Sequence, residues 1–231
     1  MILYEKKGNE TGKDYAYRVL KDNIMSLELR PGELLSELDL AQKLQVSRTP
    51  IREVLIKLKS EKLIEVKPQT GTYVSLIDWK LIEQAIFMRY NLEKKVLEEA
   101  CDKFSEDALM EMEKCIFAQN LIANKQNDLL EFHNLDNKFH ELLFEGTDKS
   151  DIWEAISNIS THYNRMRLLA EIYIKKDFIV DQHVTYLEII KENKKDIIKK
   201  TVSKHIKSPV QEWISLIDEN ESVEKYIKNY K

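Results

Sequence analysis

The stretch Ser36–Leu58, SELDLAQKLQVSRTPIREVLIKL, decides the fold of the N-terminal part of the chain. Ser36 followed three residues later by Asp39 is a capping-box-like start for a first helix. Ser47 offers an N-cap for a second helix, and Pro50 falls within its first turn, where the missing N–H does no harm. The apolar residues of this second helix recur at helical spacing and share one buried face: Ile51, Val54, Leu55 and Leu58. The pattern predicts two short helices joined by a tight turn.

The polar side of the second helix has the residues that contact DNA in a helix-turn-helix. Arg48, Thr49 and Arg52 lie on or near that side, at the helix N-terminus, the part that enters the major groove. An ordinary helical hairpin with a solvated basic face is the alternative. Residues 41–67 carry seven Lys or Arg against three Glu, whereas the whole chain has a net charge of −4. This local positive charge favours the DNA-binding interpretation.

The next segment has the pattern of a wing. Ile64–Lys67 and Thr72–Val74 are short β-prone runs, and Pro68-Gln69-Thr70-Gly71 between them is a turn. Together with the two helices, this predicts a winged helix-turn-helix. We expect the DNA contacts to come from Ser47, Arg48, Thr49, Arg52, Thr70 and Gly71.

Residues 14–75 resemble the N-terminal domain of GntR-family transcription regulators. The resemblance is carried by GELLSELDLA (Gly32–Ala41), VSRTPIREVL (Val46–Leu55) and GTYV (Gly71–Val74). It implies an operator of double-stranded DNA. Lys62 stands where the family usually has glycine, so we expect the recognition helix to end without a left-handed residue.

Composition limits the remaining possibilities. A length of 231 residues suits one large or two modest domains, and five glycines, four prolines and 33% charged residues favour long solvated helices. Cys101 and Cys115 have no metal-site spacing and are interpreted as free thiols. With no long apolar run and no signal segment, we expect a soluble cytoplasmic protein that does not enter a membrane.

The chain is expected to be mainly α-helical, with four parts. These are a flexible tail (1–13), the winged helix-turn-helix DNA-binding domain (14–75), an all-helical antiparallel bundle that binds effector and metal (79–219), and a C-terminal tail (220–231). Asp14 is the expected cap of the first helix. Six helices are expected in the bundle, at 79–101, 105–124, 126–145, 150–172, 177–192 and 194–218.

A second group of residues has the chemistry of a metal site. Asp136 and His140 are four residues apart on one helix and so share a face. An antiparallel bundle could bring His183 and His205 to the same level, and three imidazoles with one carboxylate suit a divalent metal. On spacing alone this signal is weak, because a lone histidine on a helix is more often a surface or hydrogen-bonded core residue.

The helical half also resembles the FCD ligand-binding domain of the FadR-type branch of the GntR family. Arg89 and Glu93 match its R-x3-E pattern, while Asp136, Phe139 and His140 match D-x2-F-H. The resemblance implies that Asp136, His140, His183 and His205 hold a divalent metal. From the donor set we expect zinc foremost, or nickel, manganese or iron. The resemblance also implies that a small organic acid binds beside the metal. The six expected helices are similar to the VanR-like subgroup.

Three residues are expected to contact the effector: Arg89, His162 and Arg165. For Arg89 the alternative is a surface ion pair with Glu93 that contributes little. At least one of Arg165 and Arg167 is expected to be a solvated charge. His133 is expected at the rim of the site.

These features favour a homodimeric regulator that binds a palindromic operator and responds to a small carboxylate or sugar acid. A metal sensor, in which the ion itself is the signal, is an alternative. A metal-dependent enzyme is less favoured, because no candidate general base has a fixed spacing to the site and an enzyme would not need a winged domain. We therefore expect no enzymatic activity.

Overall fold

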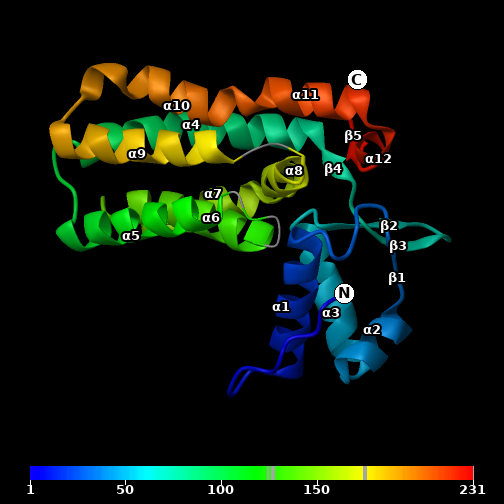
Figure 1. Cartoon of the computed structure of the whole chain (residues 1–231). Helices are drawn as coiled ribbons and strands as arrows, with labels where there is room; N and C mark the ends of the chain where they lie inside the picture. Colours follow the sequence, from blue (N-terminus) through cyan, green and yellow to red (C-terminus); the bar gives the residue numbers. More distant parts are fainter. Residues whose placement is uncertain (124, 126–127, 174–175, 231) are drawn as a thin grey trace. The chain divides into compact units, whose positions relative to one another are not determined.

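The computed structural model describes residues 1–123, 125, 128–173 and 176–230. The chain forms two compact units. The first comprises Met1–Lys80 together with Ser222–Lys231, and the second comprises Leu81–Glu221. The chain as a whole is mainly helical, as expected (Figure 1). No helix in the described part of the chain is both long and apolar enough to span a membrane.

The N-terminal unit is a winged helix-turn-helix. Its helices and strands up to the start of the bundle are α1 (Gly12–Met25), β1 (Leu34–Leu35), α2 (Glu37–Leu44), α3 (Arg48–Ser60), β2 (Ile64–Lys67), β3 (Gly71–Val74) and β4 (Ile77–Asp78). The first three strands form an antiparallel sheet in the order β1-β3-β2, in which Ile64 lies opposite Val74. Strands β2 and β3 are therefore the wing.

Local capping explains the two helices of the motif. The Ser36 hydroxyl accepts a hydrogen bond from the Asp39 N–H at 3.3 Å, and Gln45 adopts a left-handed conformation that ends α2. Ser47 is the N-cap of α3 by its backbone, although its side chain makes no capping bond. The apolar face of α3 is buried as predicted, with Ile51 and Leu58 fully enclosed.

Two details of this unit differ from expectation. Helix α1 begins at Gly12 with Thr11 as its cap, because the Thr11 hydroxyl accepts the Asp14 N–H at 3.1 Å; the prediction that Asp14 is the cap was wrong. Helix α3 does end with a left-handed residue, since Lys62 has a φ of 60°. The Leu63 N–H then bonds the Leu58 carbonyl at 3.0 Å, as in a Schellman motif. Lysine occupies the position that glycine fills without steric cost.

Both termini of the chain pack in the N-terminal unit. The segment before α1 lies against that helix, and Arg18 donates a hydrogen bond to the Glu5 carbonyl at 3.0 Å. At the other end of the chain, α12 (Glu221–Glu224) is followed by β5 (Ile227–Lys228), which pairs in parallel with β4. The Tyr230 ring meets the Trp79 ring edge-on, with centroids 5.5 Å apart. The C-terminal residues therefore complete a two-stranded sheet.

The second unit is a bundle of helices (Figure 1). They are α4 (Trp79–Ala100, which starts in the first unit), α5 (Glu106–Ile122), α6 (Leu129–Glu145), α7 (Ser150–Ile159), α8 (Thr161–Glu171), α9 (Asp177–Glu192), α10 (Ile198–Lys207) and α11 (Pro209–Glu219), with a 3₁₀ turn η2 (Lys195–Ile197). The six-helix prediction was wrong in two places. The fourth predicted helix is divided at Ser160, and the sixth at Ser208, before Pro209, which has no N–H to donate. Membership of the VanR-like subgroup, which rested on six helices, stays a prediction.

Packing of α5 against α6 and α9 positions the site. The core between these helices is apolar and includes Phe132, Phe139, Phe144 and Tyr186, all fully buried. Polar residues on the inner faces of α6, α9 and α10 are therefore held in a tightly packed surrounding, where side-chain orientation is restricted.

Candidate metal centre and nucleic-acid interface

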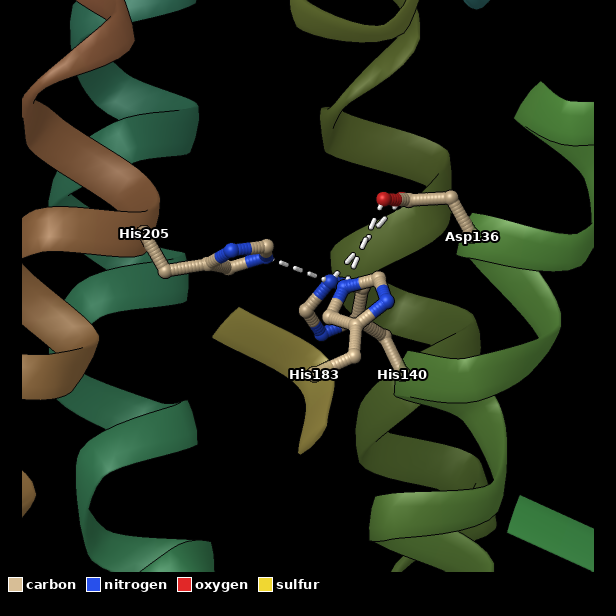
Figure 2. A group of neighbouring side chains, drawn as sticks. All are labelled: Asp136, His140, His183 and His205. Atoms are coloured by element: carbon tan, nitrogen blue, oxygen red, sulfur yellow. Dashed lines mark hydrogen bonds and ion pairs between the residues drawn. The ribbon is translucent and has the colours of Figure 1, made fainter. Parts of the chain in front are cut away.

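Four side chains from three helices converge in the bundle, as Figure 2 shows. They are Asp136 and His140 from α6, His183 from α9 and His205 from α10. One possible ligand atom from each lies within 4.8 Å of those of the other three, and all four residues are buried. The structure thus brings together the four residues that were predicted from the sequence as metal ligands.

The converging atoms are imidazole Nε2 atoms and carboxylate oxygens. His140 Nε2 lies 3.0 Å from His205 Nε2, and His183 Nε2 lies 3.5 Å from the Oδ1 atom of Asp136. The other Asp136 oxygen, Oδ2, lies 3.9 Å from His140 Nε2. Ligand atoms bound to one zinc ion at about 2.0–2.2 Å lie roughly 3 to 3.5 Å apart, so these spacings are close to those of a metal site.

The Nδ1 atom of each histidine faces a side-chain oxygen outside the cluster. His183 Nδ1 lies 2.8 Å from Gln119 Oε1, and His205 Nδ1 lies 2.7 Å from Gln182 Oε1. His140 Nδ1 lies 3.0 Å from Glu93 Oε2, and this contact is an ion-pair contact, because neither atom has a hydrogen-bond partner in the described structure. An oxygen acceptor places the proton on Nδ1 and leaves the Nε2 lone pair directed at the centre of the cluster.

In these tautomers no Nε2 atom at the centre of the cluster carries a proton. With protons on both Nδ1 atoms, neither His140 nor His205 can donate a hydrogen bond across the 3.0 Å that separates their Nε2 atoms. His183 Nε2 is buried and has no hydrogen-bond partner within the described structure. Buried lone pairs that face one another are unfavourable, and a cation would satisfy all three.

Electrostatics keeps the ligands in the protonation states that bind metal. Burial lowers the pKa of His183 to about 3 and that of His205 well below its usual value, so both rings are neutral at pH 7. Burial alone would raise the pKa of Asp136, but the Arg167 guanidinium holds that pKa well below its ordinary value. Neutral imidazoles and an ionised carboxylate are the forms that coordinate metal.

A cavity of about 40 Å³ lies beside the cluster. Its wall includes Asp136 and His205 from the cluster, together with Arg167, Glu171 and Lys176. The apolar part of the wall is formed mainly by Tyr163, Ala170, Phe178, Ile179, Pro209 and Trp213. A small ligand in this cavity would contact both the cluster and charged side chains.

The predicted effector contacts lie behind this cavity wall. Arg89 is 1% exposed and its Nε donates to Glu93 Oε1 at 2.6 Å, so the alternative of a surface ion pair was wrong. Arg165 is also buried and lies 3.0 Å from His162 Nδ1. Neither arginine nor His162 is among the described residues that line the cavity.

The expectation of a solvated arginine in this region was also wrong. Arg165 and Arg167 are both buried, and Arg167 donates to Asp136 and, at 2.7 Å, to Asn137 Oδ1. His133, which was expected at the rim, is buried and lies 3.3 Å from Glu171 Oε2. Arg167 is therefore the guanidinium in direct contact with both the cluster and the cavity.

Sequence reasoning missed Gln119, Gln182 and Lys176. Glutamine on a helix is usually a solvated residue. Only its spacing from the predicted ligands along the chain could have indicated a contact with them. Gln182 precedes the predicted ligand His183 and points instead to His205. Lys176 lies just before α9 and follows a second lysine, and no pattern in this part of the sequence indicates burial.

The predicted DNA contacts lie at one end of α3 and in the wing. Ser47, Arg48, Thr49 and Arg52 are exposed, and Arg52 Nε lies 2.8 Å from Glu37 Oε2, which leaves its two terminal amino groups for another acceptor. In the wing, Thr70 is exposed and Gly71 has a φ of 139°, in the region that favours glycine. A Cβ at Gly71 would lie 2.7 Å from a methyl carbon of the exposed Leu34 side chain, which can move aside, so the positive φ is what favours glycine here.

Two family models match the sequence. The model described as "Bacterial regulatory proteins, gntR family" matches residues 13–74, and the model described as "FCD domain" matches residues 84–208. The first match lies within the first compact unit, and the second match lies within the second unit.

Individual relatives match across both units. The chain is 28% identical over 191 residues to the HTH-type transcriptional repressor RspR of Escherichia coli K12, and the aligned region covers 82% of this chain and 83% of RspR. It is 30% identical over 187 residues to the gluconate operon transcriptional repressor of Bacillus subtilis, covering 78% and 76% of the two chains. Among solved structures, E. coli McbR/YncC aligns with a TM-score of 0.73 at 18% identity, over 91% of this chain and 99% of that one. This last similarity shows the fold alone.

Proposed function

The chain belongs to the gntR family of bacterial regulatory proteins and carries an FCD domain, and from this premise we propose that it binds a divalent metal and a small organic acid that together modulate its binding to an operator. Its domains and relatives are those of transcription regulators, not of enzymes. The family accounts for regulated DNA binding. The metal, the class of ligand and the dimer are the specific content of the proposal.

The proposed metal ligands are Asp136, His140, His183 and His205. The observation that carries this proposal is the shared orientation of the three imidazoles, each with Nδ1 beside a side-chain oxygen and Nε2 turned to a common centre. This outer set of acceptors is typical of histidines that bind metal. Zinc fits three nitrogens and one oxygen best, and nickel, manganese or iron(II) accept the same donors.

A bound ion would supply a positive anchor beside the cavity. It would also link α6, α9 and α10 and so stabilise the folded bundle, because the unfolded chain has no preformed site. The residues of this chain that hold the ligand are Arg167, which lines the cavity, and the apolar side chains around it.

The proposed effector is a small carboxylate or sugar acid. One relative is named for a gluconate operon, which is a reason to include sugar acids among the compounds tested. Arg89, His162 and Arg165 stay as proposed effector residues. The guanidinium of Arg89 lies 4.9 Å from the centre of the Tyr163 ring, and Tyr163 lines the cavity, so Arg89 can act on a ligand through that ring.

For DNA recognition we propose that Arg48 and Arg52 contact bases, while Ser47 and Thr49 contact phosphates. Thr70 and Gly71 would bring the wing close to the minor groove. One winged domain contacts too few phosphates for tight specific binding, so we propose a homodimer that binds a palindromic operator.

Elemental analysis after reconstitution with zinc tests the metal site. About one zinc per chain is expected for the wild-type protein, and loss of zinc for His140→Ala and His183→Ala. His162→Ala is the matched control, because it removes a buried imidazole outside the cluster and should leave the zinc content unchanged. Wild-type protein that stays free of metal, or cluster variants with full metal content, would overturn the proposal.

A metal sensor is the second candidate, and it is favoured by the burial of all four ligands. Titration of operator binding with the metal alone separates the two functions. A sensor responds to the ion without any organic acid, whereas the proposed regulator requires the acid.

A further inference from the structure

A groove lies where the first residues of the chain meet the turn that precedes α3. Its volume is about 380 Å³. It is lined by residues 3–6, by Tyr15 of α1 and by residues 43–46, which end α2 and form the turn. Val46 in this lining is followed directly by the proposed DNA contacts at the start of α3. The groove therefore continues the proposed DNA interface.

The chain before α1 is held in place by polar contacts with that helix (Figure 1). Asn23 of α1 is fully buried, and its amide group accepts a hydrogen bond from the Ile2 N–H and donates one to the Ile2 carbonyl at 2.8 Å. Arg18 donates to the Glu5 carbonyl at 3.0 Å and to Glu10 at 2.8 Å. The N-terminal side of the groove is thus an ordered backbone, and binding a partner there costs less conformational entropy.

Two lysines give the groove its positive charge. Lys6 and Lys43 both line it, both are exposed, and neither forms an ion pair with a described residue. Glu5 is the acidic residue of the lining, and Tyr4 and Tyr15 add hydroxyl groups. Lysine ammonium and tyrosine hydroxyl groups are among those that contact DNA phosphates. The chemistry of the groove therefore fits a phosphate backbone.

We propose that this groove binds the DNA backbone and that Lys6 and Lys43 each contact a phosphate. This inference rests on the proposed function, in which the start of α3 enters the major groove. A phosphate contact fixes the position of a protein on the duplex and carries no sequence information. The two lysines therefore act on affinity and not on the choice of operator, and the N-terminal segment is part of the DNA interface.

Binding of the full-length protein to a short double-stranded DNA of arbitrary sequence tests the proposal, because phosphate contacts do not depend on sequence. Each contact releases counter-ions, so its loss makes the slope of log K against log salt shallower by about 0.9. Lys6→Gln and Lys43→Gln are each expected to have this effect. Between about 50 and 200 mM salt, the double variant should therefore lose about 12-fold less affinity than the wild type.

A control variant and a second measurement assign the effect to the groove. Lys59→Gln is the matched control, since it removes an exposed lysine from the last turn of α3 and should keep the wild-type slope. Circular dichroism of each variant checks folding. The second measurement uses the wild-type protein, in which lysines are acetylated with and without DNA and located by mass spectrometry. DNA should protect Lys6 and Lys43 from acetylation and leave Lys59 as reactive as in the free protein.

Three results would overturn the inference. They are a wild-type slope in either single variant, equal acetylation of Lys6 and Lys43 with and without DNA, and protection that rises with protein concentration when no DNA is present. The last result would place a second copy of the chain in the groove.

Arg48→Ala on the same DNA separates this inference from the proposed function. A shallower slope for Arg48→Ala alone would keep α3 in the DNA interface and remove the groove from it. A shallower slope for the two lysine variants alone would support the groove and remove the start of α3. Wild-type protein that binds no DNA would overturn both.

Discussion

Replacing Gln119 with leucine should weaken metal binding although it removes no metal ligand. Gln119 lies on α5, is fully buried, and its Oε1 atom faces His183 Nδ1 at 2.8 Å. Leucine is similar in size but cannot accept a hydrogen bond. The His183 ring would then lose the contact that sets its tautomer and its orientation toward the cluster.

The expected magnitude has two parts. Without metal, a buried N–H of His183 is left unsatisfied, which should lower the free energy of unfolding by about 1–3 kcal/mol. With metal, loss of an outer acceptor of this kind weakens affinity by about 10–100-fold, or roughly 1.4–2.7 kcal/mol. His140 and His205 keep their own neighbouring oxygens, so the metal should be weakened and not lost.

Competition for zinc with a chromophoric chelator measures the affinity, and urea unfolding measures the stability of the metal-free protein. Gln119→Glu should restore metal binding, because a carboxylate also accepts the Nδ1 proton. Gln211→Leu on the exposed side of α11 is the matched control and should behave as wild type. The reasoning is refuted if Gln119→Leu keeps wild-type zinc affinity while His183→Ala loses the metal.

Three other predictions concern DNA binding, assembly and stability. Arg48→Ala and Arg52→Ala should each cost about 1–3 kcal/mol of operator affinity in a fluorescence titration, since each removes a potential bidentate contact with guanine; wild-type affinity in both would exclude α3 as the recognition helix. Sedimentation should find a dimer at micromolar concentration, free and on DNA, and a monomer in both states would contradict the palindromic operator. Lys62→Gly should raise the free energy of unfolding by about 1 kcal/mol, because it relieves the left-handed lysine; Lys59→Gly, inside the helix, should lower it by a similar amount.

The DNA-binding fold was largely predictable because its signals are local. Ser36 as a cap, Pro50 in a first turn and a glycine at Gly71 each require only their immediate neighbours in the sequence. The prediction for Lys62 was wrong because it considered only the low preference of lysine for the left-handed conformation. The contacts of the flanking residues impose that backbone conformation at this position. The Leu63 N–H bond to Leu58 and the burial of Leu63 hold that turn in its left-handed form.

The metal cluster was predictable in part, and its surroundings were not. Asp136 and His140 share a face by spacing, but for His183 and His205 the spacing showed only that an antiparallel bundle could bring them close, and the resemblance to a family supported that interpretation. The oxygens that face the histidine Nδ1 atoms lie on elements whose relative position no sequence pattern predicts. Gln119 on α5, for example, faces His183 on α9. Arg165 and Arg167 were expected to include a solvated charge because burial of arginine depends on long-range partners such as Asp136.

The pairing of β4 with β5 has a consequence for the order in which the protein can fold during translation. Ile77 and Trp79 leave the ribosome early, but Ile227 and Tyr230 follow only after all of Leu81–Glu221 has been synthesised. Domains usually fold as units in the order of their synthesis, with the N-terminal one first. Here the unit that starts first is completed last, and a nascent chain halted before residue 222 lacks the strand that closes it.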